Sequence, residues 1–194
     1  MDNEIKTIKI PQIFHSDGTG KPFDHCIDCG CNLLDGKITY LIEKAVKQFP
    51  KYNTKDTIFE YAICINCSLK LYASFSKESR IAMDNYFGEH SDEFKEHIEK
   101  LDIDTFDVND FISTCVMKGT SIKELNEYQI ICQCRGDNLV LSYPPYMVSG
   151  AAIDEVANLL SNKTIDTLGG FMDDNLGLPP EIKDILKDQP VFVF

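Results

Sequence analysis

The stretch His25-Cys26-Ile27-Asp28-Cys29-Gly30-Cys31 places three cysteines close together, and Cys64-Ile65-Asn66-Cys67 follows later in the chain. Each stretch holds a Cys-x-x-Cys pair, and two intervening residues let one tight turn aim both sulfurs at a single ion. Gly30 directly follows the first pair and can adopt the positive φ that suits such a turn. The sequence therefore predicts one four-thiolate metal site, with structural zinc as the expected ion. Its predicted ligands are Cys26, Cys29, Cys64 and Cys67.

The second pair differs from the first because Ser68, and not glycine, follows Cys67. A strand-like run ends at this pair and a helix-like run begins there, and a helix N-terminus stabilises a thiolate. This order of elements resembles the treble-clef class of zinc finger over about residues 24–87. It consists of a knuckle, a hairpin and then a ligand pair at the start of a helix. The resemblance implies that the four cysteines are the ligands, and it implies no particular role. The hairpin is longer than in small members of that class, so a zinc ribbon stays the alternative.

Other chemistry for the paired cysteines is less favoured. A thioredoxin-type redox site has one Cys-x-x-Cys motif in a βαβ context, which is missing here. Iron also binds four thiolates. A catalytic zinc keeps an open position, so four cysteines favour a structural role. Cys31 is an alternative ligand or a residue packed beside the site. His25 is a candidate hydrogen-bond donor to the ligands, although a surface histidine is the simpler interpretation.

Three further cysteines lie in the second half of the chain. Cys132 and Cys134 alternate along a strand-like run and are expected to share its core face. Free cysteine is among the most buried residue types, so we expect Cys132, Cys134 and Cys115 to pack in the interior and not to form a second metal site.

The first half is expected to contain a hairpin and a helix. Residues 37–49 carry mixed helical and alternating patterns, but residues 57–65 are rich in β-branched and aromatic types, so a hairpin over 38–64 is preferred. Residues 68–87 predict one helix that stops at Gly88. Ser91 is the expected N-cap of the next helix.

The expected domain boundary lies between Gly88 and Ser91, and the charge of the sequence changes there. Residues 89–110 contain nine carboxylate side chains and two lysines. We therefore expect an α+β protein in which residues 1–88 form the treble-clef-like zinc module and residues 89–194 form an acidic α+β domain with a hairpin and C-terminal helices. The expected elements of this second part are a short helix near 107–115, a helical turn at 121–124, a hairpin at 128–143, helices after Ser149 and within 164–176, and a helix at 179–186. The apolar end at 191–194 is expected to dock onto the body of the protein.

Composition limits the classes of partner. The chain has 194 residues and a net charge of −12, which repels phosphate backbones. The total charge thus argues against nucleic-acid binding. The alternative is a local strip of Lys44, Lys47, Lys51 and Lys55, interleaved with Phe49 and Tyr52, that overrides it. The chain has no long apolar run and no export signal at its N-terminus, so a cytoplasmic location and no membrane association are expected.

No recognisable catalytic set accompanies the cysteines. The sequence has no G-x-S-x-G or H-E-x-x-H motif. His90 and His97, with Glu93 and Glu96, form a weak candidate site, and two exposed histidines on an acidic helix are the simpler interpretation. The leading hypothesis is a zinc-stabilised protein–protein interaction or regulatory module, for which the acidic charge favours a basic partner. A nucleic-acid-binding protein and an enzyme with an unrecognised C-terminal site are the alternatives.

Overall fold

Strands β2 (Thr39–Phe49) and β3 (Thr54–Cys64) form a long antiparallel hairpin in the computed structural model, which describes residues 6–177. The prediction of a hairpin over 38–64 is therefore confirmed. The turn is a single 3-10 turn, Pro50–Tyr52, followed by Asn53 in the left-handed region. Proline sets the φ of such a turn, and asparagine tolerates positive φ, so the local sequence accounts for the reversal.

The hairpin continues into one antiparallel sheet that contains strands from both halves of the chain. β2 pairs along its other edge with β4 (Glu127–Arg135), from Thr39 opposite Arg135 to Lys47 opposite Glu127. The strand order is β1-β5-β4-β2-β3, and β6 pairs with β4. The short strands are β1 (Thr7–Lys9), β5 (Asn138–Val140) and β6 (Tyr146–Ser149). The sheet therefore crosses the predicted boundary at residues 88–89 without a break.

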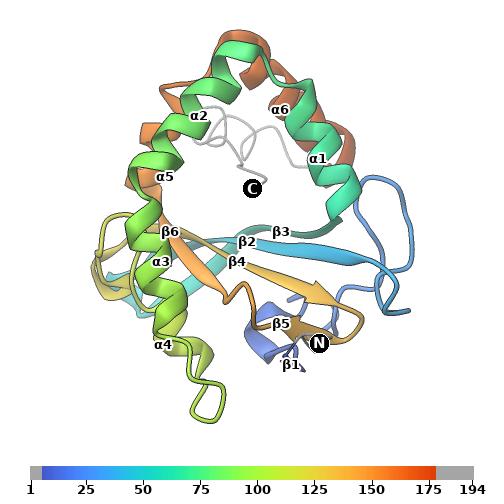
Figure 1. Cartoon of the computed structure of the whole chain (residues 1–194), viewed down its shortest axis with the longest axis vertical. Coiled ribbons are helices and arrows are strands. Elements are labelled where there is room, and N and C mark those ends of the chain that lie inside the picture. The colour runs from blue at the N-terminus through green and yellow to red at the C-terminus, as the bar shows by residue number, and fades with distance from the viewer. Residues whose placement is uncertain (1–5, 178–194) are drawn as a thin grey trace, which may run out of the picture.

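Four of the six described α-helices stand as an arch over one side of the sheet (Figure 1). These helices are α1 (Ile65–Ser74), α2 (Lys77–Glu89), α5 (Gly150–Ala157) and α6 (Asn162–Leu176). Helices α3 (Ser91–Glu99) and α4 (Val108–Ile112) continue from the lower end of α2. The described part of the chain thus has the predicted α+β class.

The single helix predicted over 68–87 is wrong, because the chain forms two helices there. Phe75 and Ser76 have extended backbone angles, and the Ser76 side chain accepts a hydrogen bond from the backbone N–H of Ser79. This N-cap starts α2 in a new direction. The predicted end at Gly88 and the predicted N-cap Ser91 are also displaced, since α2 continues to Glu89 and His90 precedes α3.

Hydroxyl groups join the N-termini of α2 and α6. Ser79 Oγ lies 3.2 Å from Ser161 Oγ and accepts the backbone N–H of Ser161 at 2.9 Å. Thr164 Oγ1 accepts the backbone N–H of Ser76 at 3.0 Å. Each helix N-terminus therefore finds partners for its free N–H groups in the other helix, which fixes their contact at the top of the arch.

The other helices, turns and strands predicted for the second half are found where the structure describes them. Asp107 caps α4, Ser121 caps a 3-10 turn at Ile122–Glu124, and Ser149 caps α5. β4 and β5 form the predicted hairpin. α6 runs through Gly169 and Gly170 without interruption. The helix predicted at 179–186 and the apolar end at 191–194 lie outside the described residues.

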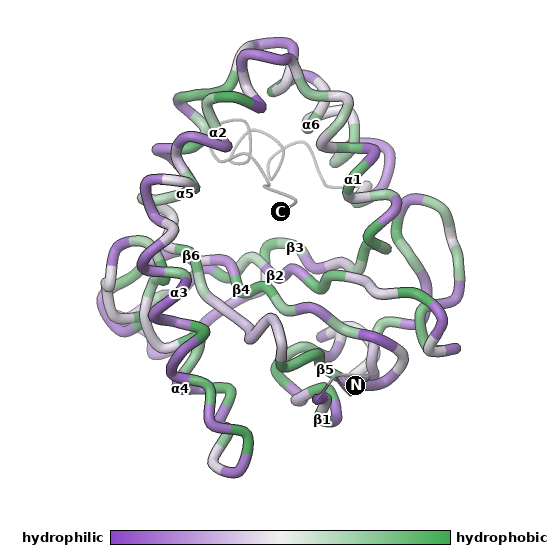
Figure 2. The backbone as a smooth tube through the Cα atoms, viewed as in Figure 1, coloured by the Kyte–Doolittle hydropathy of each residue, from purple (hydrophilic) through white to green (hydrophobic). Residues whose placement is uncertain are grey.

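The central strand β2, whose hydropathy Figure 2 shows, is buried at every residue from Tyr40 to Val46, so both of its faces are covered there. Glu43 is an exception to the apolar pattern, because its side chain is buried on β2 opposite Tyr61. The Tyr61 hydroxyl donates to Glu43 Oε2 at 2.6 Å, and within residues 6–177 the other oxygen, Oε1, has no partner. Burial raises the pKa of Glu43 to about 8, which favours the neutral acid in the folded protein.

Within residues 6–177, the helices lack the combination of length and apolarity that spanning a membrane requires.

The buried Glu43 carboxyl should make stability fall as the pH rises. Its pKa is about 8 in the folded protein against 4.5 for an ordinary glutamate, so the folded state holds the additional proton between these values. The free energy of unfolding should then decrease by at most about 1.4 kcal/mol per pH unit through this window. Urea unfolding of a Glu43→Gln variant should show a flatter pH dependence between about pH 5 and 7. An exposed control, Glu93→Gln, should retain the wild-type slope, and equal slopes for all three proteins would contradict the assignment.

Candidate metal centre

The first cysteine pair lies in a small knuckle that is closed by backbone hydrogen bonds. His25 and Asn32 form an isolated antiparallel bridge, and the Cys26 N–H donates to the Cys31 carbonyl at 2.9 Å. The Gly30 N–H donates to the Cys26 carbonyl at 2.9 Å, with Gly30 at φ +67°. Glycine adopts this left-handed conformation without the strain that a side chain adds. The knuckle therefore follows from the local sequence, as predicted.

Two hydrogen bonds attach this knuckle to the end of β3. The Ile27 N–H donates to the Ala62 carbonyl at 2.8 Å, and the Cys64 N–H donates to Cys26 Sγ at 3.3 Å. Backbone N–H groups directed at sulfur favour the thiolate form that binds metals. The knuckle is thus held against the position where the second cysteine pair begins.

The second pair lies where β3 ends and α1 begins. Cys64 is the last residue of β3 and the N-cap of α1, and Cys67 lies in the first turn of the helix. Both are buried, with exposed fractions of 2% and 4%. The partial positive charge of the helix N-terminus stabilises negative charge on sulfur at this position.

The four predicted ligand cysteines converge on one point. The sulfurs of Cys26, Cys29, Cys64 and Cys67 all lie within 4.8 Å of one another. Zinc–sulfur bonds of about 2.3 Å in a regular tetrahedron place the sulfurs about 3.8 Å apart. The Cys29 and Cys64 sulfurs are 3.9 Å apart, and all eight cysteines are free thiols. The cluster is consistent with a zinc-binding site, and among the described residues it is the only group of histidine, cysteine and carboxylate side chains with this geometry.

The thiols of this cluster differ in acidity because they differ in surroundings. Hydrogen bonding from the Cys31 backbone lowers the pKa of Cys29 to about 6. Burial raises the pKa of Cys26 and of Cys67. A metal that binds here must displace the protons of the buried thiols, so its binding releases protons and weakens at low pH.

The other cysteines and His25 lie outside this convergence. Cys31 is half-buried beside the site, and burial raises its pKa to about 12. The His25 ring contacts the Asp24 carboxylate at 2.9 Å on the surface. Cys132 and Cys134 share the core face of β4, with sulfurs 3.6 Å apart and no exposed surface. Cys115 is also buried, so the three distal cysteines pack as predicted.

The interpretation of His90 and His97 as two exposed histidines is wrong, because His97 is buried and His90 is only partly exposed. The His97 side chain is 8% exposed, and its Nε2 donates to the Pro145 carbonyl at 2.8 Å. Burial lowers the pKa of His97. His97 therefore joins α3 to the segment before β6 and does not present a free ligand atom with His90, whose ring packs on Tyr86.

Two members of the lysine strip are engaged by carboxylates. Lys44 is buried on β2, where its ammonium group contacts Asp17 at 2.6 Å and Glu60 at 3.0 Å. Lys47 contacts Glu127 at 2.6 Å. Part of the positive charge that a phosphate backbone would need is therefore neutralised within the protein.

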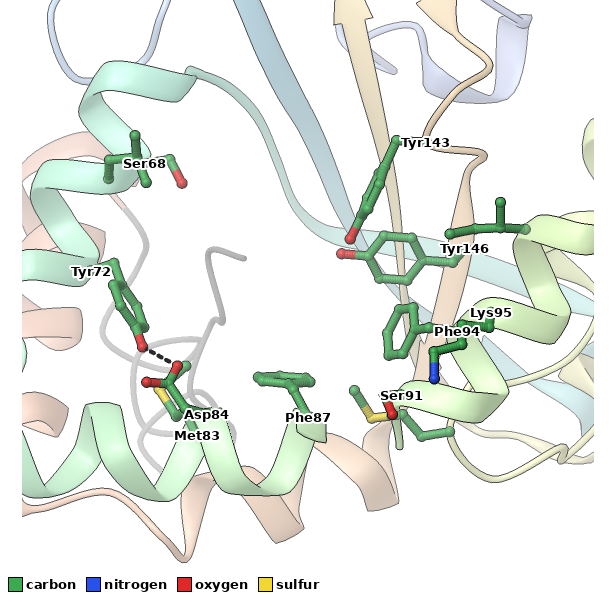
Figure 3. Close-up of a pocket in the computed structure, with 13 residues that line it drawn as sticks. Ser68, Tyr72, Met83, Asp84, Phe87, Ser91, Phe94, Lys95, Tyr143 and Tyr146 are labelled. Atoms are coloured by element: carbon green, nitrogen blue, oxygen red, sulfur yellow. Dashed lines mark hydrogen bonds between the residues drawn. The ribbon is translucent and has the colours of Figure 1, made fainter. Parts of the chain in front are cut away.

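A cavity of about 530 Å³ between α1, α2 and α3 was not anticipated from the sequence (Figure 3). Apolar residues spaced three or four apart line it from each helix, and the signal for it was present in these spacings. The pairs are Leu69 with Tyr72, Met83 with Phe87, and Phe94 with Ile98. The sequence shows the apolar spacing within each helix, but it does not show that the apolar faces of the three helices point toward one another.

Comparisons with protein-family models, with curated proteins and with solved structures give no match. The function is therefore inferred from the residues and their geometry alone.

Replacing Cys29 should remove the metal without damaging the core, because this ligand is exposed whereas the other three are buried. A Cys29→Ser variant should weaken zinc binding by at least about tenfold, since serine supplies neither thiolate charge nor softness. Cys31→Ser is the matched control in the same knuckle and should keep the wild-type affinity. Zinc content after passage over a chelating resin measures both. Equal loss in the two variants would place Cys31 among the ligands.

Proposed function

We propose that this protein is a zinc-stabilised protein–protein interaction module in which one structural zinc is held by Cys26, Cys29, Cys64 and Cys67. The observation that carries the proposal is the convergence of four cysteine sulfurs within 4.8 Å. Four thiolates fill the coordination sphere of zinc, whereas a catalytic zinc keeps a position for water or substrate. The metal then contributes to folding by joining the knuckle to the start of α1.

The arrangement of the site supports a treble-clef-like module. A glycine-bearing knuckle provides the first ligand pair, and a helix N-terminus provides the second pair after a hairpin. A zinc ribbon would place the second pair in another knuckle. The treble-clef class serves many roles, so the function must be inferred from other surfaces of the molecule.

The remaining surfaces favour recognition over catalysis. Among residues 6–177, those that line the large cavity include one carboxylate, Asp84, and no histidine. Asp84 accepts a hydrogen bond from Tyr72 at 2.6 Å. The chain has a net charge of −12, which favours encounter with a basic protein. Free thiols suit a reducing compartment, which supports the proposal of a cytoplasmic location.

Removing the metal should destabilise the knuckle and α1 first. We expect purified protein to contain one zinc per chain by elemental analysis, which also separates zinc from iron. A strong chelator should lower the melting temperature and increase hydrogen exchange in residues 24–33 and 62–74, because both ligand pairs lie there. Re-addition of zinc should restore both properties, and addition of magnesium serves as the control. Unchanged circular dichroism and melting temperature after complete metal removal would refute the structural role.

A further inference from the structure

The cavity between α1, α2 and α3 is an open apolar groove. Leu69 from α1 and Ile98 from α3 both line it, and their exposed fractions are 60% and 41%. Figure 3 shows Tyr143 and Tyr146 on the far wall with their hydroxyls directed into the groove, and Phe87 below them. Exposing large apolar side chains around a hollow costs free energy, and such surfaces commonly mark binding sites.

The surface beside the groove, around α3, is strongly acidic. This acidic wall lies outside the groove lining, whose charged residues are Asp84 and Lys95. Residues 89–110 carry nine carboxylate side chains and two lysines, a net charge of −7, and all eleven are exposed. One lysine that borders the groove, Lys95, contacts Asp92 at 2.7 Å. An occupant that lies in the groove and along α3 would therefore experience a negative potential, which favours a positively charged ligand.

The groove offers few backbone groups to an extended peptide. Most of its lining residues lie on helices, whose backbone groups are bonded internally. The strand that borders it, β6, is paired with β4 on one edge, and its other edge is covered by Cys115, which forms a bridge with Met147. The Val116 N–H also donates to the Met147 carbonyl at 2.9 Å. A helix satisfies its own backbone and places apolar side chains three and four residues apart, so it suits this groove.

We propose that the groove between α1, α2 and α3 binds a basic amphipathic helix of a protein partner. This inference rests on the proposed interaction function and names its partner class. Apolar side chains of the partner enter the cavity beside Leu69 and Ile98, and its lysines or arginines lie along the carboxylates of α3. The seventeen residues after Gly177 carry three carboxylate side chains and two lysines. They lack the positive charge that the acidic wall favours.

The test uses zinc-loaded full-length protein and a fluorescent synthetic helix of about 18 residues, with leucine and phenylalanine on one face and lysine on the other. Fluorescence anisotropy gives its dissociation constant. Two matched peptides, one with glutamate for lysine and one with glutamine for the apolar residues, should bind at least about tenfold more weakly. Binding of the basic helix should also weaken with added salt, because the surface charges are screened. Equal binding of all three peptides, or no binding of the basic helix, overturns the proposal.

Substitutions locate the contact. Leu69→Asp should raise the dissociation constant by at least about tenfold. Ile81→Asp is the control, because Ile81 is 50% exposed on α2 but does not line the groove. It should change the constant by less than about twofold. Glu96→Gln with Glu99→Gln should weaken binding and reduce its salt dependence. Equal effects of the Leu69 and Ile81 variants would place the contact elsewhere and overturn the proposal.

Two further measurements distinguish other occupants. A Phe192→Ser, Phe194→Ser variant that binds the peptide at least about tenfold more tightly would assign the groove to the chain's own C-terminal segment. A dimer in sedimentation equilibrium that Leu69→Asp dissociates would assign it to a second copy. Either result overturns the proposal. The zinc content and the chelation response test the structural zinc independently, so that role can stand when the groove assignment fails.

Discussion

The pairing of β2 with neighbours on both edges is the constraint on which the rest of the structure depends. One edge binds β3, which delivers Cys64 to the metal cluster, and the other edge binds β4 from the second half of the chain. β2 also carries the buried Lys44, whose ammonium group donates to the His15 carbonyl and contacts Asp17 and Glu60. These bonds hold the loop before the knuckle against the hairpin. A buried ammonium group is stable only with such partners, so this loop and the sheet depend on one another.

The cysteine cluster and the groove are connected through α1. Cys67 lies on the buried side of this helix at its N-terminus, and Leu69, two residues later, lies exposed at the groove. Successive helical positions are rotated by about 100°, so these neighbours face different surroundings. A zinc ion bound by the four sulfurs would hold the start of α1 relative to the sheet. It would thereby fix the wall that carries Leu69. In the proposed function, the metal stabilises a recognition surface and does not take part in recognition.

Polar groups in the interior fix how the helices of the arch meet, because apolar contacts are not directional. The hydroxyls of Ser76, Ser79, Ser161 and Thr164 join the N-termini of α2 and α6. Beneath the arch, burial favours the neutral form of the Glu43 carboxyl, which accepts a hydrogen bond from the Tyr61 hydroxyl. Hydrogen bonds require specific partners and directions, so they specify which helices meet. The acidic exposed surface of 89–110 has the opposite role, because its charges remain in water and are available to a partner.

The sequence by itself determined the local features. The two Cys-x-x-Cys pairs and Gly30 predicted the knuckle and the four converging cysteines, and the residue pattern of 57–65 predicted the hairpin. Prediction from the sequence failed at Phe75–Ser76, where the hydroxyl cluster with α6 favours two helices over one. It also failed at His97, which is buried and hydrogen-bonded to the Pro145 carbonyl. The common sheet across residue 88 and the groove beside Leu69 were also decided only by the tertiary structure. Spacing and turn chemistry act over a few residues, whereas these features depend on contacts between segments far apart in the chain.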